Sequence, residues 1–167
     1  MHAPPSNPAL LVVEDNPHTR RLVHYWLHQQ YALTLVPDAR KALQVATEET
    51  FDLFLLDINL GQGINGVELL KVLRRMPTYA ATPAVAFTVL GLPGERRRFM
   101  EQGFDGFLSK PFTKEQIHDT LGVALGTPHV ELPERPAEPP LFVPLRALDR
   151  PPQRLQRHAH IHRLHAR

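Results

Sequence analysis

The sequence contains no cysteine, and no stretch of it approaches the roughly 18 apolar residues that a membrane-spanning helix requires. Without cysteine, disulfide bonds and metal sites with thiolate ligands are excluded. The N-terminal stretch MHAPPSNPALLVVED lacks the basic start and the long apolar centre of a secretory signal peptide. There is also no internal repeat. We therefore expect a soluble, cytoplasmic protein that makes no contact with a membrane.

Charge and proline are unevenly distributed, with a change near residue 127. Residues 1–127 contain 12 Lys and Arg and 13 Asp and Glu, so this part is almost neutral. Residues 128–167 contain 7 Arg, 4 acidic residues, and 8 of the 17 prolines. Prolines interrupt helices, and the apolar content there is too low for a second core. We expect a flexible N-terminus over 1–8, one domain over 9–127 and a disordered tail over 128–167.

Two segments of the tail could have a function of their own. LFVPLRAL (141–148) is its only apolar cluster and could dock on the domain or on a partner. HAHIHRLH (158–165) has four closely spaced histidines, and imidazole suits Zn, Cu or Ni when a fold fixes the geometry. Basic segments also bind phosphates without a fold. We favour a dispensable extension; apart from such a weak tail contact, no binding to nucleic acid is expected.

Strand-like and helix-like patterns alternate strictly between residues 9 and 127. The predicted strands are Ala9–Val13, Ala32–Val36, Leu53–Leu56, Ala84–Phe87 and Gly106–Leu108. The predicted helices cover about 17–30, the segment after Asp38, the segment from Gly66 to before Pro77, about 94–102, and the segment after Thr113. Strict alternation favours right-handed crossovers and a parallel sheet. The sequence thus predicts an α/β fold, a doubly wound five-stranded parallel sheet with helices on both faces.

Five polar residues lie at or just past the ends of these predicted strands: Glu14, Asp15, Asp57, Thr88 and Lys110. In open parallel sheets, binding sites form at the carboxyl ends of the strands. Three carboxylates at one edge would repel one another strongly without a cation. Oxygen ligands of this kind suit Mg²⁺ or Mn²⁺. The pattern therefore predicts a magnesium or manganese site at this edge.

The same residues could support a phosphoryl group on an aspartate. A metal ion and Lys110 would neutralise phosphoryl oxygens, and the Thr88 hydroxyl would donate to one of them. Asp57 ends the apolar run FDLFLLD, so a rigid buried strand would fix its position. We therefore assign Asp57 as the nucleophile.

Four motifs in this order and spacing resemble the receiver domain of two-component response regulators over roughly residues 9–125. They are VVEDN (12–16), LLDINL (55–60), FTV (87–89) and FLSKPF (107–112). The resemblance implies the flavodoxin-like receiver fold. It also implies a phosphoryl group taken from a histidine of a sensor histidine kinase or a histidine phosphotransfer protein. We expect a receiver that catalyses its own phosphorylation and dephosphorylation and has no metabolic activity.

The resemblance also implies a role for each matching residue. By this resemblance, the Lys110–Pro111 peptide is expected to be cis, which aims the lysine inward. Asp57 would be the phosphoacceptor and a metal ligand, Asp15 a metal ligand, Glu14 a ligand directly or through water, and Asn59 a ligand through its backbone carbonyl. Thr88 and Lys110 would bind the phosphoryl oxygens. Phe107 would be the switch aromatic that responds to Thr88.

Three departures from the family pattern leave alternatives open. Val89 is bulkier than the usual residue after the switch hydroxyl and could slow hydrolysis of the acyl phosphate. The loop LGQGING after the nucleophile has one extra residue, and no DNA-binding or enzymatic output domain is recognisable, which suggests a stand-alone receiver. The alternatives are a phosphorylation-independent interaction module and an aspartyl-phosphate phosphatase of the haloacid dehalogenase type. Arg96, Arg97 and Arg98 could form a partner-binding face or a plain solvated one.

Overall fold

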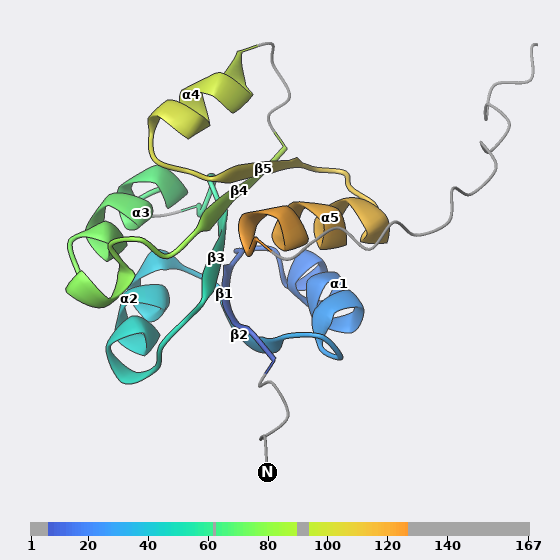
Figure 1. Ribbon diagram of the computed structural model, residues 1–167, viewed down its shortest axis with the longest axis horizontal. Coiled ribbons are helices and arrows are strands. Elements are labelled where there is room, and N and C mark those ends of the chain that lie inside the picture. The colour runs from blue at the N-terminus through green and yellow to red at the C-terminus, as the bar shows by residue number, and fades with distance from the viewer. Residues whose placement is uncertain (1–6, 62, 90–93, 127–167) are drawn as a thin grey trace, which may run out of the picture. The chain divides into compact units, whose positions relative to one another are not determined.

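The fold is a five-stranded parallel sheet with helices on both faces (Figure 1). The computed structural model describes residues 7–61, 63–89 and 94–126. The strands are β1 (Ala9–Val13), β2 (Ala32–Val36), β3 (Leu53–Asp57), β4 (Ala84–Thr88) and β5 (Gly106–Ser109), in the order β2-β1-β3-β4-β5. Every neighbouring pair is parallel. The predicted fold class is confirmed.

A helix follows each strand, and side chains at the helix starts explain where most of them begin. The helices are α1 (Pro17–Leu27), α2 (Ala39–Glu48), α3 (Gly66–Arg74), α4 (Glu95–Glu101) and α5 (Lys114–Ala124), with a short 3₁₀ turn η1 (Pro77–Tyr79) before β4. Asn16 accepts hydrogen bonds from the first turn of α1, and Asp38 does the same for α2. Asn65 and Thr113 form capping boxes at α3 and α5.

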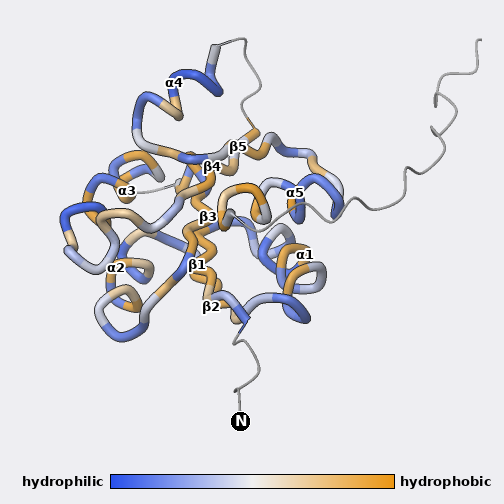
Figure 2. The backbone as a smooth tube through the Cα atoms, in the orientation of Figure 1, coloured by the Kyte–Doolittle hydropathy of each residue, from blue (hydrophilic) through white to orange (hydrophobic). Residues whose placement is uncertain are grey.

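Alternate residues of the strands face opposite sides of the sheet and build two cores. Leu11, Val13, Phe54 and Leu56 pack with α2, α3 and α4. On the other face, strand residues such as Leu10 and Val12 pack with α1 and α5. Figure 2 shows the apolar strands in the centre and the polar outer sides of the helices. Because β3 is covered on both faces, all five of its residues are buried, which explains its unbroken apolar run.

The strand order places the polar rim at the point where the chain reverses direction across the sheet. β1 lies between β2 and β3, so the chain leaves it toward one edge and later returns to the other side. At such a point, the loops after the two central strands diverge and open a crevice. Glu14 and Asp15 follow β1, and Asp57 is the last residue of β3. The fold itself therefore brings the acidic residues of two distant segments to one crevice.

Several predicted boundaries were wrong by a few residues. α1 ends at Leu27 rather than near residue 30, and β3, β4 and β5 each extend one residue further than predicted. The 3₁₀ turn at Pro77 was not predicted; α3 already ends at Arg74.

No helix in the described ranges is long and apolar enough to cross a bilayer. The predicted N-terminal segment 1–8 falls mostly, and the tail 128–167 entirely, outside the described residues.

Candidate functional site: an acidic crevice with one lysine

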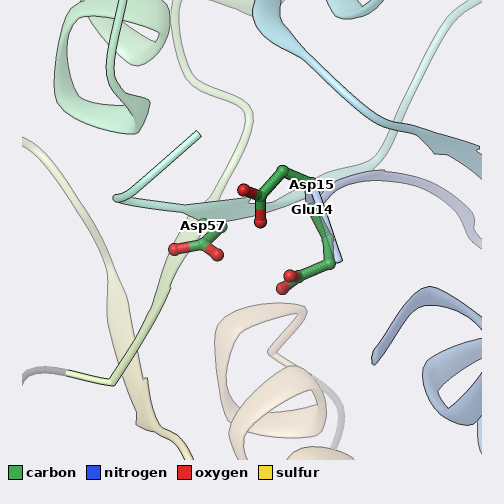
Figure 3. Close-up of side chains that lie close together, drawn as sticks. All are labelled: Glu14, Asp15 and Asp57. Atoms are coloured by element: carbon green, nitrogen blue, oxygen red, sulfur yellow. The ribbon is translucent and has the colours of Figure 1, made fainter. Parts of the chain in front are cut away.

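Three carboxylates meet at the carboxyl ends of β1 and β3. Glu14, Asp15 and Asp57 each offer one oxygen, and these oxygens all lie within 4.8 Å of one another. Figure 3 shows the three side chains around a common space. Glu14 and Asp57 are buried, with exposed fractions of 0% and 4%, whereas Asp15 is exposed. The cluster therefore consists of two buried acids and one exposed acid, and solvent reaches it on the side of Asp15.

Lys110 supplies the positive charge that the buried acids require. It follows β5, and its Nζ donates to Asp57 Oδ2 at 2.6 Å and also to Glu14 Oε2. The same Nζ lies 4.2 Å from the centre of the Phe87 ring, a favourable position for a cation. The Lys110–Pro111 peptide is cis, as expected. One lysine thus links the ends of three strands through charge-assisted hydrogen bonds.

Glu14 is the acid whose environment is most unusual. Burial raises its pKa above the ordinary value, and the hydrogen bond from Lys110 acts in the opposite direction. Its Oε1 accepts a hydrogen bond from the backbone N–H of Asn16 at 3.1 Å. Sequence reasoning placed Lys110 only against a phosphoryl group and missed its bond to Glu14. No local signal could have revealed that bond, because 96 residues separate the partners.

Arg20 fixes the backbone of the acidic pair, a role that was not predicted. Its Nη1 donates to the carbonyl oxygens of Glu14 at 2.6 Å and Asp15 at 2.8 Å. The guanidinium therefore holds the turn between β1 and α1 through its carbonyl groups. The only sequence signal is that Arg20 lies one helical turn after the N-cap Asn16, on the same face of the helix as that residue.

The loop after Asp57 is held close to the Asp57 carboxylate by its own backbone. The N–H of Asn59 donates to Asp57 Oδ1 at 2.9 Å, so both oxygens of this carboxylate accept a hydrogen bond. A Cβ at Gly66 would lie 2.2 Å from the carbonyl oxygen of Asp57. Only glycine permits α3 to start this close to the end of β3. Gly66 is thus a positioning residue, although the sequence indicated only a helix start.

Thr88 and Phe107 lie on the neighbouring strands β4 and β5. Asp57 pairs with Phe87 in the register of β3 and β4, so the buried Thr88 is one residue beyond the partner of Asp57. Phe107 is half-buried, and its ring stacks on Phe99 of α4 with centroids 5.7 Å apart. Val89 is 65% exposed. Thr88 is thus at the carboxyl end of its strand, whereas Phe107 is the second residue of β5 and pairs with Ala86 in the middle of β4.

The donor set fits a hard divalent cation. All three nearby side chains offer carboxylate oxygens, which are the ligands that Mg²⁺ and Mn²⁺ prefer. Mg²⁺ keeps several waters when it binds, and the exposed side of Asp15 gives it access to water. Lys110 already neutralises part of the charge on Glu14 and Asp57. An ion bound beside Asp15 would neutralise the remainder.

Comparisons with known proteins agree with this geometry. Residues 10–122 match the family described as response regulator receiver domain. The chain is 37% identical over 112 residues to the transcriptional activator protein PfeR of Pseudomonas aeruginosa. The matched region covers 66% of this chain and 35% of PfeR. It is 26% identical over 113 residues to the signal transduction histidine-protein kinase BarA of Escherichia coli, covering 67% of this chain and 12% of BarA. The chain thus spans about a third and about an eighth of these relatives.

Solved structures show the same fold. The chemotaxis response regulator CheY4 of Vibrio cholerae superposes with a TM-score of 0.67 at 28% identity, covering 71% of this chain and 99% of CheY4. The receiver domain of a sensor histidine kinase from Pseudomonas aeruginosa, solved with a magnesium ion coordinated in its active site cleft, gives 0.65 at 27% identity, covering 73% and 100%. Receivers are signalling domains rather than metabolic enzymes. From the family match, the fold and the acidic crevice together, this chain belongs to the response regulator receiver domain family.

Proposed function

We propose that Asp57 accepts a phosphoryl group from a phosphohistidine and that the protein signals through this modification. The observation that carries the proposal is the surroundings of Asp57. It is a buried carboxylate at the end of a central strand, bonded to Lys110 and within 4.8 Å of two further acids. Such a buried acid is costly as a purely structural element. As an anchored nucleophile beside a cation site, it is well placed for phosphoryl transfer.

The chemistry follows from the hydrogen bonds of Asp57. One carboxylate oxygen attacks phosphorus, the P–N bond of the phosphohistidine breaks, and the departing imidazole nitrogen takes up a proton. Lys110 Nζ, now on Asp57 Oδ2, moves onto a phosphoryl oxygen, and the Thr88 hydroxyl donates to another. A bound Mg²⁺ would supply charge neutralisation on the phosphoryl oxygens. Glu14, Asp15, Asp57 and the Asn59 carbonyl are the groups proposed to hold it.

The readout is proposed to run through β4 and β5. Movement of Thr88 toward the phosphoryl group would free space beside Phe107, which stacks on Phe99 of α4. The aromatic contact would then change the surface of α4, where Arg96, Arg97 and Arg98 are exposed. A partner bound there would distinguish the two states by its differential affinity.

The proposed donor is a sensor histidine kinase or a histidine phosphotransfer protein in the cytoplasm. Relatives that are themselves histidine kinases contain a segment similar to this chain, which supports such a partner. We propose that the receiver occupies residues 9–127 and that it also catalyses loss of its own phosphoryl group. Family membership and the position of Asp57 on the third strand favour this function over hydrolysis of phosphate esters of the haloacid dehalogenase type.

Incubation with a small phosphodonor and Mg²⁺ tests the proposal. We expect one phosphoryl group per chain by intact mass, labile to acid and base, and none on Asp57→Asn. Asp38→Asn is the matched control: Asp38 caps α2, asparagine caps a helix equally well, and labelling should be unchanged. Undiminished labelling of Asp57→Asn would refute the assignment.

A further inference from the structure

We propose that His24 and His28 form a second metal site, for a transition-metal dication such as Ni²⁺, Cu²⁺ or Zn²⁺, on the exposed side of α1. The two residues are four positions apart at the C-terminal end of α1, with His24 in its last turn and His28 as its C-cap, and both are exposed. Their rings are stacked, with centroids 5.3 Å apart and planes inclined by 10°. Imidazoles four residues apart on one helix face are a known arrangement for binding a metal ion.

The hydrogen bonds of His28 leave one ring nitrogen free to bind a metal. Its Nδ1 lies 3.1 Å from the carbonyl oxygens of both His24 and Tyr25. A carbonyl only accepts, so Nδ1 carries the proton, and in the neutral ring Nε2 carries the lone pair. A metal-bound histidine usually donates its other N–H to a carbonyl or carboxylate in this way, which fixes the tautomer and the ring orientation. His28 therefore has the tautomer and the support that a ligand needs.

His24 completes the chelate from one turn earlier. Its ring is exposed, so rotation about its Cβ–Cγ bond can turn a lone pair toward an ion that His28 binds. Typical metal–imidazole distances are about 2.0–2.1 Å, along the nitrogen lone pair in the ring plane. Because the two ring planes are nearly parallel and the centroids are 5.3 Å apart, the His24 ring has to turn out of the stack before both rings bind one ion. Water would fill the remaining positions. Two imidazoles select Ni²⁺, Cu²⁺ or Zn²⁺ over Mg²⁺, which prefers oxygen ligands.

The position on the helix has opposing effects on a cation. The pair lies at the C-terminal end of α1, where the partial negative charge of the helix dipole attracts positive charge. Arg21, one turn before His24, is exposed and repels it. We therefore expect Arg21→Gln to tighten binding modestly.

This second site is separate from the acidic crevice. α1 starts at Pro17, two residues after Asp15, and its 11 residues span about 16 Å at 1.5 Å per residue. His24 and His28 thus lie toward the far end of the helix from the carboxylates. Occupation of the histidine pair should leave phosphoryl transfer at Asp57 unchanged, so failure of one proposal does not affect the other.

The test is a calorimetric titration with Ni²⁺ on the full chain in saturating Mg²⁺, which occupies oxygen sites. The histidines of HAHIHRLH (158–165) are first replaced by alanine in every sample, because they could also bind Ni²⁺. We expect one site per chain, and His24→Ala and His28→Ala should each weaken it by at least about tenfold, since loss of one arm removes the chelate effect.

His18→Ala is the matched control. His18 is an exposed histidine of the same helix, in its first turn, and its removal should leave affinity unchanged. Circular dichroism checks that each variant folds, and broadening of the His24 and His28 imidazole signals by Ni²⁺ in NMR spectra locates the ion. The proposal is overturned if the parent shows no site, if His24→Ala binds as tightly as the parent, or if His18→Ala loses as much affinity.

Discussion

The acidic crevice and the outer surface of α1 and α5 place their ionisable groups in opposite ways. In the crevice, Glu14, Asp57 and Lys110 come from three different strand ends; the two acids are buried and Lys110 is partly buried. On the helices, His24 and His28 are neighbours because of helical spacing alone. A constellation of the first kind exists only when the whole sheet has formed, whereas the second needs only one helix. Changes in the crevice should therefore affect stability and chemistry together, and changes on the helices should have local effects.

Replacement of Lys110 by alanine should have the largest effect. Without Mg²⁺, Glu14 and Asp57 would remain buried without a cation, which typically costs about 3–5 kcal/mol. Loss of a donor to the phosphoryl oxygens should slow phosphorylation by about 10²–10³-fold. Lys114→Ala, at an exposed helix start, should change stability by no more than about 0.5 kcal/mol. Chemical denaturation measures the stability and the rate of labelling measures the chemistry. If Lys110→Ala and Lys114→Ala changed both quantities equally, the crevice and the helix surface would not differ in the way described.

Addition of Mg²⁺ should have an intermediate effect. An ion that binds only the folded protein at 100 times its dissociation constant adds about 2.7 kcal/mol to the free energy of unfolding. Asp15→Ala should abolish this gain and, by relieving repulsion in the acidic cluster, stabilise the metal-free protein. Thermal melting with and without Mg²⁺ measures both effects. A parent protein whose melting temperature is indifferent to millimolar Mg²⁺ would contradict the metal assignment.

Acidification should have the smallest effect, through His118 on α5. Burial lowers the pKa of His118 below 6.5, with a further contribution from Lys114, and its ring lies 6.4 Å from that of Tyr31 beyond α1. Because the folded state binds this proton less readily than the unfolded chain, the contribution to stability is present above pH 6.5. It is lost as the pH falls through the lowered pKa. His118→Gln should flatten this part of the pH–stability curve; an unchanged curve would assign the effect elsewhere.

The strand-end residues could be predicted because they depend on a pattern that the sequence states directly. Five apolar runs alternate with helical patterns, and a parallel sheet places all their carboxyl ends at one edge. Asp57 and Thr88 needed no further information. The bond from Lys110 to Glu14 depends on the direction of a side chain after β5, which only the assembled sheet determines. Gly66 was recognised as a helix start, but its contact with the carbonyl of Asp57 is likewise a tertiary feature.

The predicted ends of α1 and α3 were wrong because local contacts, rather than apolar spacing, determine where these helices stop. The polar residues 28–30 were included in the predicted helix, yet α1 ends at Leu27, with His28 as its C-cap. The sequence predicts that α3 continues to Pro77, whereas Arg74 ends the helix and Pro77 opens a 3₁₀ turn. The Arg74 guanidinium donates to the carbonyl of Tyr79 in that turn and lies 3.3 Å from Asp105 before β5. These contacts join segments 31 residues apart, so hydrophobic periodicity could not reveal them.

The central claim is that Asp57 carries the phosphoryl group, and direct location of the modified residue tests it. Borohydride reduces an aspartyl phosphate to homoserine and leaves free aspartate unchanged. Trypsin should release residues 42–71, which contain both Asp57 at the end of β3 and Asp52 before it. Fragmentation of this peptide by mass spectrometry should place homoserine at position 57, with Asp52 intact. Homoserine at any other position, with Asp57 unmodified, would contradict the account.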